Sequence, residues 1–211
     1  MPDGHPRIRT FHARHGRITD VMRRAIADIG PRHEVTRRDP DRPLVLEVGC
    51  GSGEAALAFA AAHPEVDVLA ADVHTPGIAH LLLALDADPR PNVWVARADA
   101  LDLLDHDLGS SSLAGVHVFF PDPWPKARHR KRRFIRADVL DLLSDRIAPG
   151  GHLLVATDVE DYARHARAEL DAHPDFAGGP GERPAWRPVE GYEAKGTAAG
   201  RSIVELRYRR R

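Results

Sequence analysis

Short apolar runs alternate with helix-forming stretches along most of the chain, and this alternation constrains the fold more than any other feature. The apolar runs lie at residues 44–48, 66–71, 92–97, 115–120 and 152–156, and the helix-forming stretches lie at 55–62, 76–87 and 133–147. Runs this short and this apolar are typical of strands that are buried on both faces. We therefore predict an α/β fold with a doubly wound, mostly parallel sheet and helices on both of its faces. Ligands of such a sheet bind at the carboxyl ends of its strands.

The two ends of the chain are less regular than its middle. Residues 1–40 are basic and are broken by Pro and Gly, which indicates a basic N-terminal arm with one helix near 18–29, followed by one domain at 41–211. The run Thr157-Asp-Val-Glu matches a capping box and predicts that a helix begins there. Residues 174–188 are rich in Pro and Gly and are predicted to form a loop, whereas residues 203–208 alternate as a final strand.

Length and composition exclude several classes of protein. A chain of 211 residues suits one sizeable domain. No apolar run approaches the length that spans a membrane, the first residues lack the apolar core of a signal peptide, and Cys50 is the only cysteine. We therefore expect a cytoplasmic protein without disulfides. The 13 histidines occur in neither an HExxH nor a paired-cysteine spacing, so no metal is expected.

The net charge is only −1, but the charges are unevenly distributed. Basic residues gather in the first 24 positions, in 128–136, where six of nine residues are Arg or Lys, and in 207–211. Acidic residues gather in 99–107 and 158–175. Segregation of this kind can give a neutral molecule one basic face that binds nucleic acid. Ordinary solvated surfaces produce the same pattern, so charge alone leaves both interpretations open.

A glycine-rich turn follows the first predicted strand. It contains Gly49, Gly51 and Gly53, and glycines there let the backbone approach a ligand closely. The spacing is GxGxG, so the third glycine of the dinucleotide pattern GxGxxG is missing. Two carboxylates, Glu47 and Glu54, flank the turn and would repel a pyrophosphate. They favour a ligand that carries a positive ammonium and a sulfonium.

Two further acids end the next two predicted strands. Asp72 lies 19 residues after Gly53, where a carboxylate can accept both hydroxyls of a ribose. Asp99 ends the third strand, where a side chain can reach the edge of an adenine. Together with Glu47, these acids give three successive strand ends that each carry a carboxylate. This region resembles the class I S-adenosylmethionine-dependent methyltransferases, which implies a Rossmann-like methyltransferase sheet and S-adenosylmethionine as the methyl donor.

The run from Phe119 to Arg133, FFPDPWPKARHRKRR, carries the most information about the substrate. Asp122 directly follows the fourth strand, and the prolines on either side of it stiffen the loop. Trp124 could stack on a base, and the cations that follow could hold phosphates. These candidate phosphate contacts are Arg128, Arg130, Lys131, Arg132 and Arg133. A stiffened loop in front of an exposed basic helix fits the same residues, so the run by itself leaves both possibilities open.

The same run resembles the signature of the tRNA (guanine-N7-)-methyltransferases of the TrmB type. Further resemblance covers most of the chain: residues 9–11 and 14–19 resemble the amino-terminal arm of that family, 156–158 its acid after the fifth strand, and 191–196 its carboxy-terminal substrate motif. Two positions depart from the family pattern. Glu190 stands where a threonine is usual, and Met22 stands where a glutamine is common. The first departure implies a change in the finer substrate contacts.

The resemblance implies a role for each matching residue. It assigns Glu47, Asp72, Asp99 and Asp122 to the methyl donor, and Lys126, Asp158 and Glu193 to the guanine or nearby RNA. Asp122 is then the candidate catalytic residue, and the implied target is a guanine in the variable loop of tRNA. The implied reaction requires tRNA and S-adenosylmethionine, but no metal, no membrane and no obligate protein partner.

Three other functions fit parts of the sequence. A methyltransferase acting on a small molecule or a protein would share the acidic strand ends, but it would have no use for a rigid loop beside six basic residues. A nicotinamide-dependent oxidoreductase is disfavoured by Glu47 and Glu54. A non-catalytic RNA-binding relative could retain the fold, and Glu190 keeps that alternative open. Donor binding separates the second alternative from the rest, and turnover separates the third.

Overall fold

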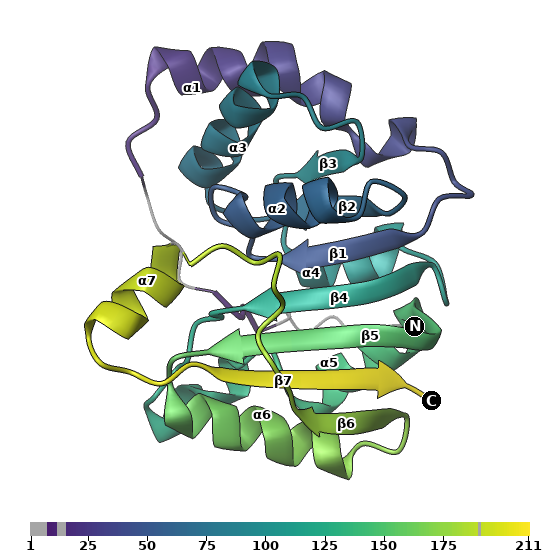
Figure 1. Ribbon diagram of the computed structural model, residues 1–211, viewed down its shortest axis with the longest axis vertical. Coiled ribbons are helices and arrows are strands. Elements are labelled where there is room, and N and C mark those ends of the chain that lie inside the picture. The colour runs from purple at the N-terminus through teal and green to yellow at the C-terminus, as the bar shows by residue number, and fades with distance from the viewer. Residues whose placement is uncertain (1–7, 12–15, 190) are drawn as a thin grey trace.

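One seven-stranded sheet organises the part of the chain that the computed structural model describes, residues 8–11, 16–189 and 191–211 (Figure 1). The strands are β1 (Leu44–Val48), β2 (Asp67–Ala71), β3 (Val93–Ala96), β4 (Leu113–Phe119), β5 (Ile147–Thr157), β6 (Phe176–Pro180) and β7 (Val204–Arg210). Their order is β3-β2-β1-β4-β5-β7-β6. Strands β1 to β5 pair in parallel, and β7 is antiparallel to both β5 and β6. The predicted doubly wound, mostly parallel sheet is confirmed.

Seven helices are present in the described chain, and α2 to α5 connect the parallel strands. They are α1 (Asp20–Arg24), α2 (Glu54–Ala62), α3 (Thr75–Ala87), α4 (Ala100–Asp102), α5 (Ala137–Arg146), α6 (Glu160–Ala172) and α7 (Gly191–Ala198). A π-helical turn, Ala25–Ile29, continues α1, and another, Leu103–Asp107, continues α4. Short 3-10 turns lie at Gly30–His33, Val35–Arg37 and Ala127–Arg132. The helix predicted near 18–29 therefore corresponds to α1 and its π-helical continuation.

Two apolar clusters cover the two faces of the sheet. In β1, Leu44 and Leu46 belong to the cluster that contains the buried residues of α5 and α6, whereas Val45 belongs to the cluster of α2 and α3. This alternation within one strand is what helices on both faces require. Ala25 and Ile29 join the second cluster, so the helix of the basic arm shares a core with the strands that follow it.

The segment between β6 and α7 covers one face of the sheet where no helix lies in the described chain. Figure 1 shows this yellow-green segment crossing in front of β7, β5 and β4. The ring of Trp186, in this segment, stacks on His117 of β4 at 5.3 Å and packs edge-on against Phe59 of α2 at 5.1 Å. Aromatic stacking thus fixes the C-terminal segment over the central strands.

Three local predictions differ from the structure. Residues 174–188 were expected to form a loop, but 176–180 form the edge strand β6, in which Gly178 lies so close to β7 that a Cβ would collide with Arg207 and Tyr208. Glycine there reflects close strand packing rather than a turn. Helix α5 begins at 137 instead of 133, after bends at 134–136. Helix α6 begins at Glu160, and the Thr157 hydroxyl accepts from the Val159 amide at 3.2 Å instead of forming the predicted capping box.

Candidate active site

The glycine-rich turn lies where β1 meets α2, as predicted. Gly49, Gly51 and Gly53 have φ angles of 70°, 59° and 84°, which residues with a Cβ rarely adopt. A Cβ built on Gly49 or Gly51 would meet no atom of the described chain within 4 Å, whereas one on Gly53 would collide with Leu81 of α3. The first two glycines therefore leave the backbone open to a ligand. The third allows α2 to pack closely against α3.

Glu47 is a buried carboxyl group beside this turn. Its residue is 3% exposed, and its Oε2 atom has no hydrogen-bond partner among the described residues. Burial, followed by the charge of Glu54, raises the pKa of Glu47 to about 8, against the opposing effects of a hydrogen bond from the Ala56 amide and the charge of Arg187. A buried acid with an unsatisfied oxygen is costly unless a ligand completes its contacts. A cationic group bound there would satisfy the oxygen and favour the ionised form.

The next two acids support the backbone of the same edge. The Asp72 carboxylate accepts hydrogen bonds from the Gly51 amide at 2.8 Å and from the His74 amide at 2.7 Å, so it holds the glycine turn against the end of β2. The Asp99 carboxylate accepts from the Leu101 amide at 3.0 Å and caps α4. Both side chains are only partly buried. Asp72 therefore contacts the same glycine turn that follows Glu47.

The loop that carries Asp122 has an unusual backbone. Phe120 and Trp124 have φ angles of 52° and 44°, so the chain turns sharply on both sides of Asp122. Stacking of Trp124 on a base was one of two possibilities that the sequence left open, and the structure contradicts it. The residue is 3% exposed, and its indole N–H donates to the Thr10 carbonyl at 2.9 Å. The guanidinium of Arg132 covers its ring at 4.9 Å. Trp124 therefore attaches the N-terminal arm to the loop.

Arg133 also departs from its predicted role as a phosphate contact. Its residue is 1% exposed, and its guanidinium donates to the Pro123 carbonyl at 3.0 Å and pairs with the Asp161 carboxylate of α6. The same guanidinium lies 5.5 Å from the Tyr162 ring. A side chain buried this way connects the Asp122 loop to α6 and is inaccessible to RNA. Sequence spacing alone does not reveal which cation of a basic run turns inward.

The other predicted cations remain near the surface. Lys126, Arg128, Arg130 and Lys131 are exposed, and Arg132 is partly buried over Trp124. Arg130 forms a 3.3 Å ion pair with Asp161, but its side chain stays about half exposed. Four cations on one short 3-10 turn and its flank therefore face solvent beside the Asp122 loop.

The predicted substrate residues Asp158 and Glu193 both contact the C-terminal part of the chain. Asp158 accepts from Arg201 at 2.8 Å, and its side chain lies against Gly196 of α7. Glu193, in α7, is buried and accepts from Arg183 at 2.5 Å and from Arg187 at 3.0 Å. The sequence pointed to Glu193 but not to its two arginine partners, which stand in the stretch predicted as a loop. Glu190 lies outside the described residues.

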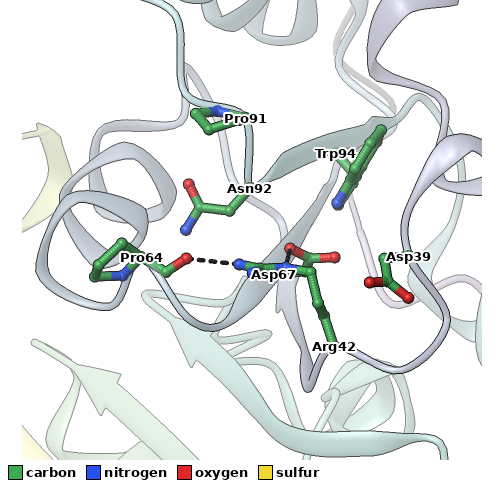
Figure 2. Close-up of a pocket in the computed structure, with 7 residues that line it drawn as sticks. All are labelled: Asp39, Arg42, Pro64, Asp67, Pro91, Asn92 and Trp94. Carbon is green, nitrogen blue, oxygen red and sulfur yellow. Dashed lines mark hydrogen bonds and ion pairs between the residues drawn. The ribbon is translucent and has the colours of Figure 1, made fainter.

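A cavity of about 290 Å³ lies at a different part of the sheet (Figure 2). It is lined by Asp39, Arg42, Pro64, Asp67, Pro91, Asn92 and Trp94. Asp67 begins β2, and Asn92 directly precedes β3, so this cavity is at the amino ends of the strands, opposite to the glycine turn. The predicted site residues are at the other edge, where the carboxyl ends of β1, β2 and β4 meet.

No metal site or membrane span accompanies these features in the described residues. They contain no group of three or more His, Cys, Asp and Glu side chains that could hold a metal ion. Within the same ranges, every helix is too short or too polar to cross a membrane.

Comparison with known proteins identifies relatives that match nearly the whole chain. The family model described as "Putative methyltransferase" matches residues 41–206. A tRNA (guanine-N(7)-)-methyltransferase from Nitrosospira multiformis is 40% identical over 220 residues, which cover 98% of this chain and 96% of the relative. A protein of the same name from Streptomyces coelicolor is 42% identical, and the match covers 97% of this chain and 81% of that one.

Solved structures support the fold at much lower identity. A variant of the 16S rRNA (adenine(1408)-N(1))-methyltransferase from Catenulisporales acidiphilia, with cosubstrate SAM, has a TM-score of 0.57 at 18% identity and covers 86% of this chain and 95% of its own. A precorrin-6y C5,15-methyltransferase from Geobacter metallireducens has a TM-score of 0.55 at 13% identity, with 90% and 89% covered. The two names concern different substrates, so these likenesses establish the fold alone.

Proposed function

The chain belongs to the family of tRNA (guanine-N(7)-)-methyltransferases, and from this premise we propose how its residues direct methyl transfer from S-adenosylmethionine to N7 of a guanine in the variable loop of tRNA. The methylation of tRNA guanine follows from about 40% identity over nearly the whole chain. The observation that carries the proposed residue roles is the unpartnered, buried oxygen of Glu47 beside the open backbone of Gly49 and Gly51.

These residues fit the methyl donor. When bound, S-adenosylmethionine supplies a methyl group that its sulfonium makes electrophilic. Glu47 offers a carboxylate to a cationic group, and Gly49 and Gly51 leave room for close approach to the backbone. Gly53 completes the turn by closing α2 against α3. Asp72 contacts the glycine turn and Asp99 follows β3 at the same edge of the sheet, and we propose that they bind the ribose and the adenine.

The guanine requires alignment more than activation. Its N7 carries an in-plane lone pair and no proton at neutral pH, so no general base is needed. Correct orientation of two reactants can supply roughly 7–11 kcal/mol of a barrier. Asp122 is the proposed catalytic residue: held in a stiff turn between two prolines, its carboxylate would accept from the Watson–Crick edge of the guanine and contact the donor. Lys126 and Asp158 would lie on either side of the base, and Glu193 would contact nearby RNA.

The exposed cations beside this loop supply the affinity for RNA. Arg128, Arg130 and Lys131 are proposed to contact phosphates, with Arg132 joining them at the edge of Trp124. Phosphate contacts release counterions, so tRNA binding should weaken steeply with salt. A guanine in an exposed loop is also easier to reach than one in a stem, because it is already partly unstacked. The proposal places this activity in the cytoplasm and needs neither a metal nor a second protein.

The direct test combines labelled S-adenosylmethionine, unmodified tRNA and cleavage of the product at N7-methylguanine. The wild-type protein should label one variable-loop guanine. Asp122→Asn should lose turnover by about 10²-fold or more while retaining donor binding. Asp107→Asn, a change at an exposed acid that ends the π-helical turn after α4, serves as the matched control. Near-normal turnover of Asp122→Asn would overturn the role of Asp122, and label at another position would overturn the target.

A further inference from the structure

Arg187 is a buried cation in the segment that crosses the sheet between β6 and α7. Its side chain is 2% exposed. It follows Trp186, whose ring stacks on His117 of β4, so this stretch of chain is held over the central strands (Figure 1). An arginine is rarely buried to this extent unless its charge is paired and its donors are satisfied. The groups that pair with the Arg187 guanidinium therefore show which parts of the fold this side chain connects.

Two carboxylates hold the guanidinium. Arg187 donates to Glu193 of α7 at 3.0 Å, and it forms a two-pronged pair with Glu205 of β7. Burial by itself would lower the pKa of Arg187, but hydrogen bonds and charges from Glu205 and Glu193 outweigh that effect and raise it. Arg183 donates to the same Glu193 but is partly exposed. The four side chains form a balanced cluster that fixes α7 to the sheet.

The opposite side of Arg187 contacts the turn that leads to Asp122. Its guanidinium lies 4.7 Å from the ring centroid of Phe119 and 5.7 Å from that of Phe120. Phe119 ends β4, and Phe120 has the positive φ that turns the chain toward Asp122. A cation over an aromatic ring attracts it electrostatically, and more strongly where both are desolvated. Arg187 thus packs behind the bend that sets the direction of Asp122.

The segment that carries Arg187 also lies against the strand beside Glu47, because Trp186 stacks on His117, which is the register partner of Glu47 on β4. Four neighbours surround the Glu47 carboxyl: Glu54 and the Ala56 amide from α2, Cys50 from the glycine turn, and Arg187 from the crossing segment. On β4, its register partner His117 stays neutral, because burial and nearby positive charges lower the pKa of that imidazole. Arg187 is therefore the cation in this set, and its charge favours ionised Glu47.

We propose that Arg187 is a positioning residue for methyl transfer: it joins α7 and its Glu193 to the turn that presents Asp122 and to the donor-binding carboxyl of Glu47. The inference rests on the proposed function, because Glu193, Asp122 and Glu47 are the substrate, catalytic and donor residues of that proposal. Glu193 lies in α7, Glu47 in β1 and Asp122 in the loop after β4. Arg187 bonds to the first, packs on the aromatic rings that precede the third, and directly follows the tryptophan that stacks on the register partner of the second.

The test compares Arg187→Gln and Arg187→Lys with Arg183→Gln, which removes the other arginine bonded to Glu193 but does not touch the Phe119 ring. Donor affinity is measured from pH 6 to 9 without tRNA, and then turnover on tRNA is measured with saturating donor. Arg187→Gln should move the pH midpoint of donor binding upward by about half a unit, which is roughly threefold weaker binding below the midpoint. It should also reduce turnover about tenfold or more.

The two other variants separate charge from geometry. Arg187→Lys retains the charge but loses the two-pronged bond, so its midpoint should stay near that of the wild type while turnover falls. Arg183→Gln should leave the midpoint unchanged. If Arg187→Gln fails to fold, as judged by circular dichroism, the lysine variant carries the test. An unchanged midpoint in Arg187→Gln, or wild-type turnover in Arg187→Lys, overturns the inference. Absence of donor binding by the wild-type protein would overturn the proposed function instead.

Discussion

Two buried carboxyl groups at opposite edges of the same sheet have opposite surroundings. Asp67, at the start of β2, is 1% exposed and is held by Arg42 at 2.8 Å and Arg38 at 3.3 Å; Figure 2 shows the Arg42 contact beside the cavity. Glu47, near the end of β1, is buried to a similar extent, but one of its oxygens has no partner in the described chain. Both acids belong to neighbouring strands whose register pairs Leu44 with Asp67 and Glu47 with Ala70.

Burial of a carboxyl group has a different consequence at each edge of the sheet. At the amino ends of the strands, the charge of Asp67 is compensated within the protein, so the acid connects the N-terminal arm to the sheet. At the carboxyl ends, burial and then the charge of Glu54 raise the pKa of Glu47 to about 8, and the charge of Arg187 offsets them only in part. An incompletely compensated acid in an open turn is what a binding site for a cation requires. The two positions should therefore respond in opposite ways to the same loss of charge.

The largest expected effect is on catalysis by Glu47→Gln. The variant retains the shape of the side chain but cannot neutralise a cationic ligand. We expect donor affinity, and with it kcat/KM, to fall about 10²–10³-fold, which corresponds to roughly 3–4 kcal/mol. Calorimetric titration with S-adenosylmethionine and steady-state kinetics on tRNA measure the two quantities. Wild-type donor affinity in Glu47→Gln would contradict the proposed role of Glu47 in binding the donor.

Asp67→Asn should affect stability instead. Removing the charge leaves Arg38 and Arg42 partly buried without their shared partner, and breaking such a pair typically costs up to about 3 kcal/mol. Urea denaturation measures the free energy of unfolding, and donor affinity at low temperature should match that of the wild type. Asp88→Asn, which breaks the exposed pair with Arg90, should change the free energy of unfolding by about 0.5 kcal/mol or less. Equal losses in both variants would contradict a structural role specific to Asp67.

The third effect is the pH dependence of stability. The pKa of Glu47 is near 8 in the folded chain and has its ordinary value of 4.5 in the unfolded chain, so the folded state binds more protons between these values. Stability must then fall as the pH rises from about 4.5 to 8, because the unfolded state releases the proton first. The difference in stability between Glu47→Gln and the wild type should therefore grow steadily as the pH rises over this range. A pH-independent difference in urea midpoints would show that Glu47 is ionised in the folded protein.

Local patterns in the sequence were sufficient to predict where the glycine turn and the acids at the strand ends lie. The strand, the glycines and the acid at each strand end follow one another within a few residues, and the parallel sheet brings the ends together without further information. The structure placed Gly49, Gly51 and Gly53 in the conformations that only glycine adopts readily. It also explained why the three differ, since contact with Leu81 of α3 distinguishes Gly53 from the others.

The remaining features depend on contacts between distant segments. Arg133 turns inward because Asp161 lies on a helix 28 residues further along the chain. Trp124 is buried because Thr10 returns to it across 114 residues. Arg187 stands in a stretch that its Pro and Gly content predicts to be a loop, but the stretch contains a strand and part of a buried charge cluster. Composition predicts that such residues are polar or aromatic, but only the packing determines whether they face RNA or the interior.

The smallest expected effect uses two tryptophans, one from each edge. Trp124→Phe retains a buried ring but loses the hydrogen bond to Thr10, which should lower the free energy of unfolding by about 1 kcal/mol. It should also weaken tRNA binding a few-fold by releasing the arm, while donor affinity stays constant.

Trp94 lines the cavity at the opposite edge, and its buried indole nitrogen lacks a hydrogen-bond partner within the described ranges (Figure 2). Trp94→Phe removes that unsatisfied donor, so stability should stay the same or rise. Thermal melting and a tRNA-binding titration distinguish the two: equal losses would mean that ring size, and not the Thr10 contact, determines the contribution of Trp124.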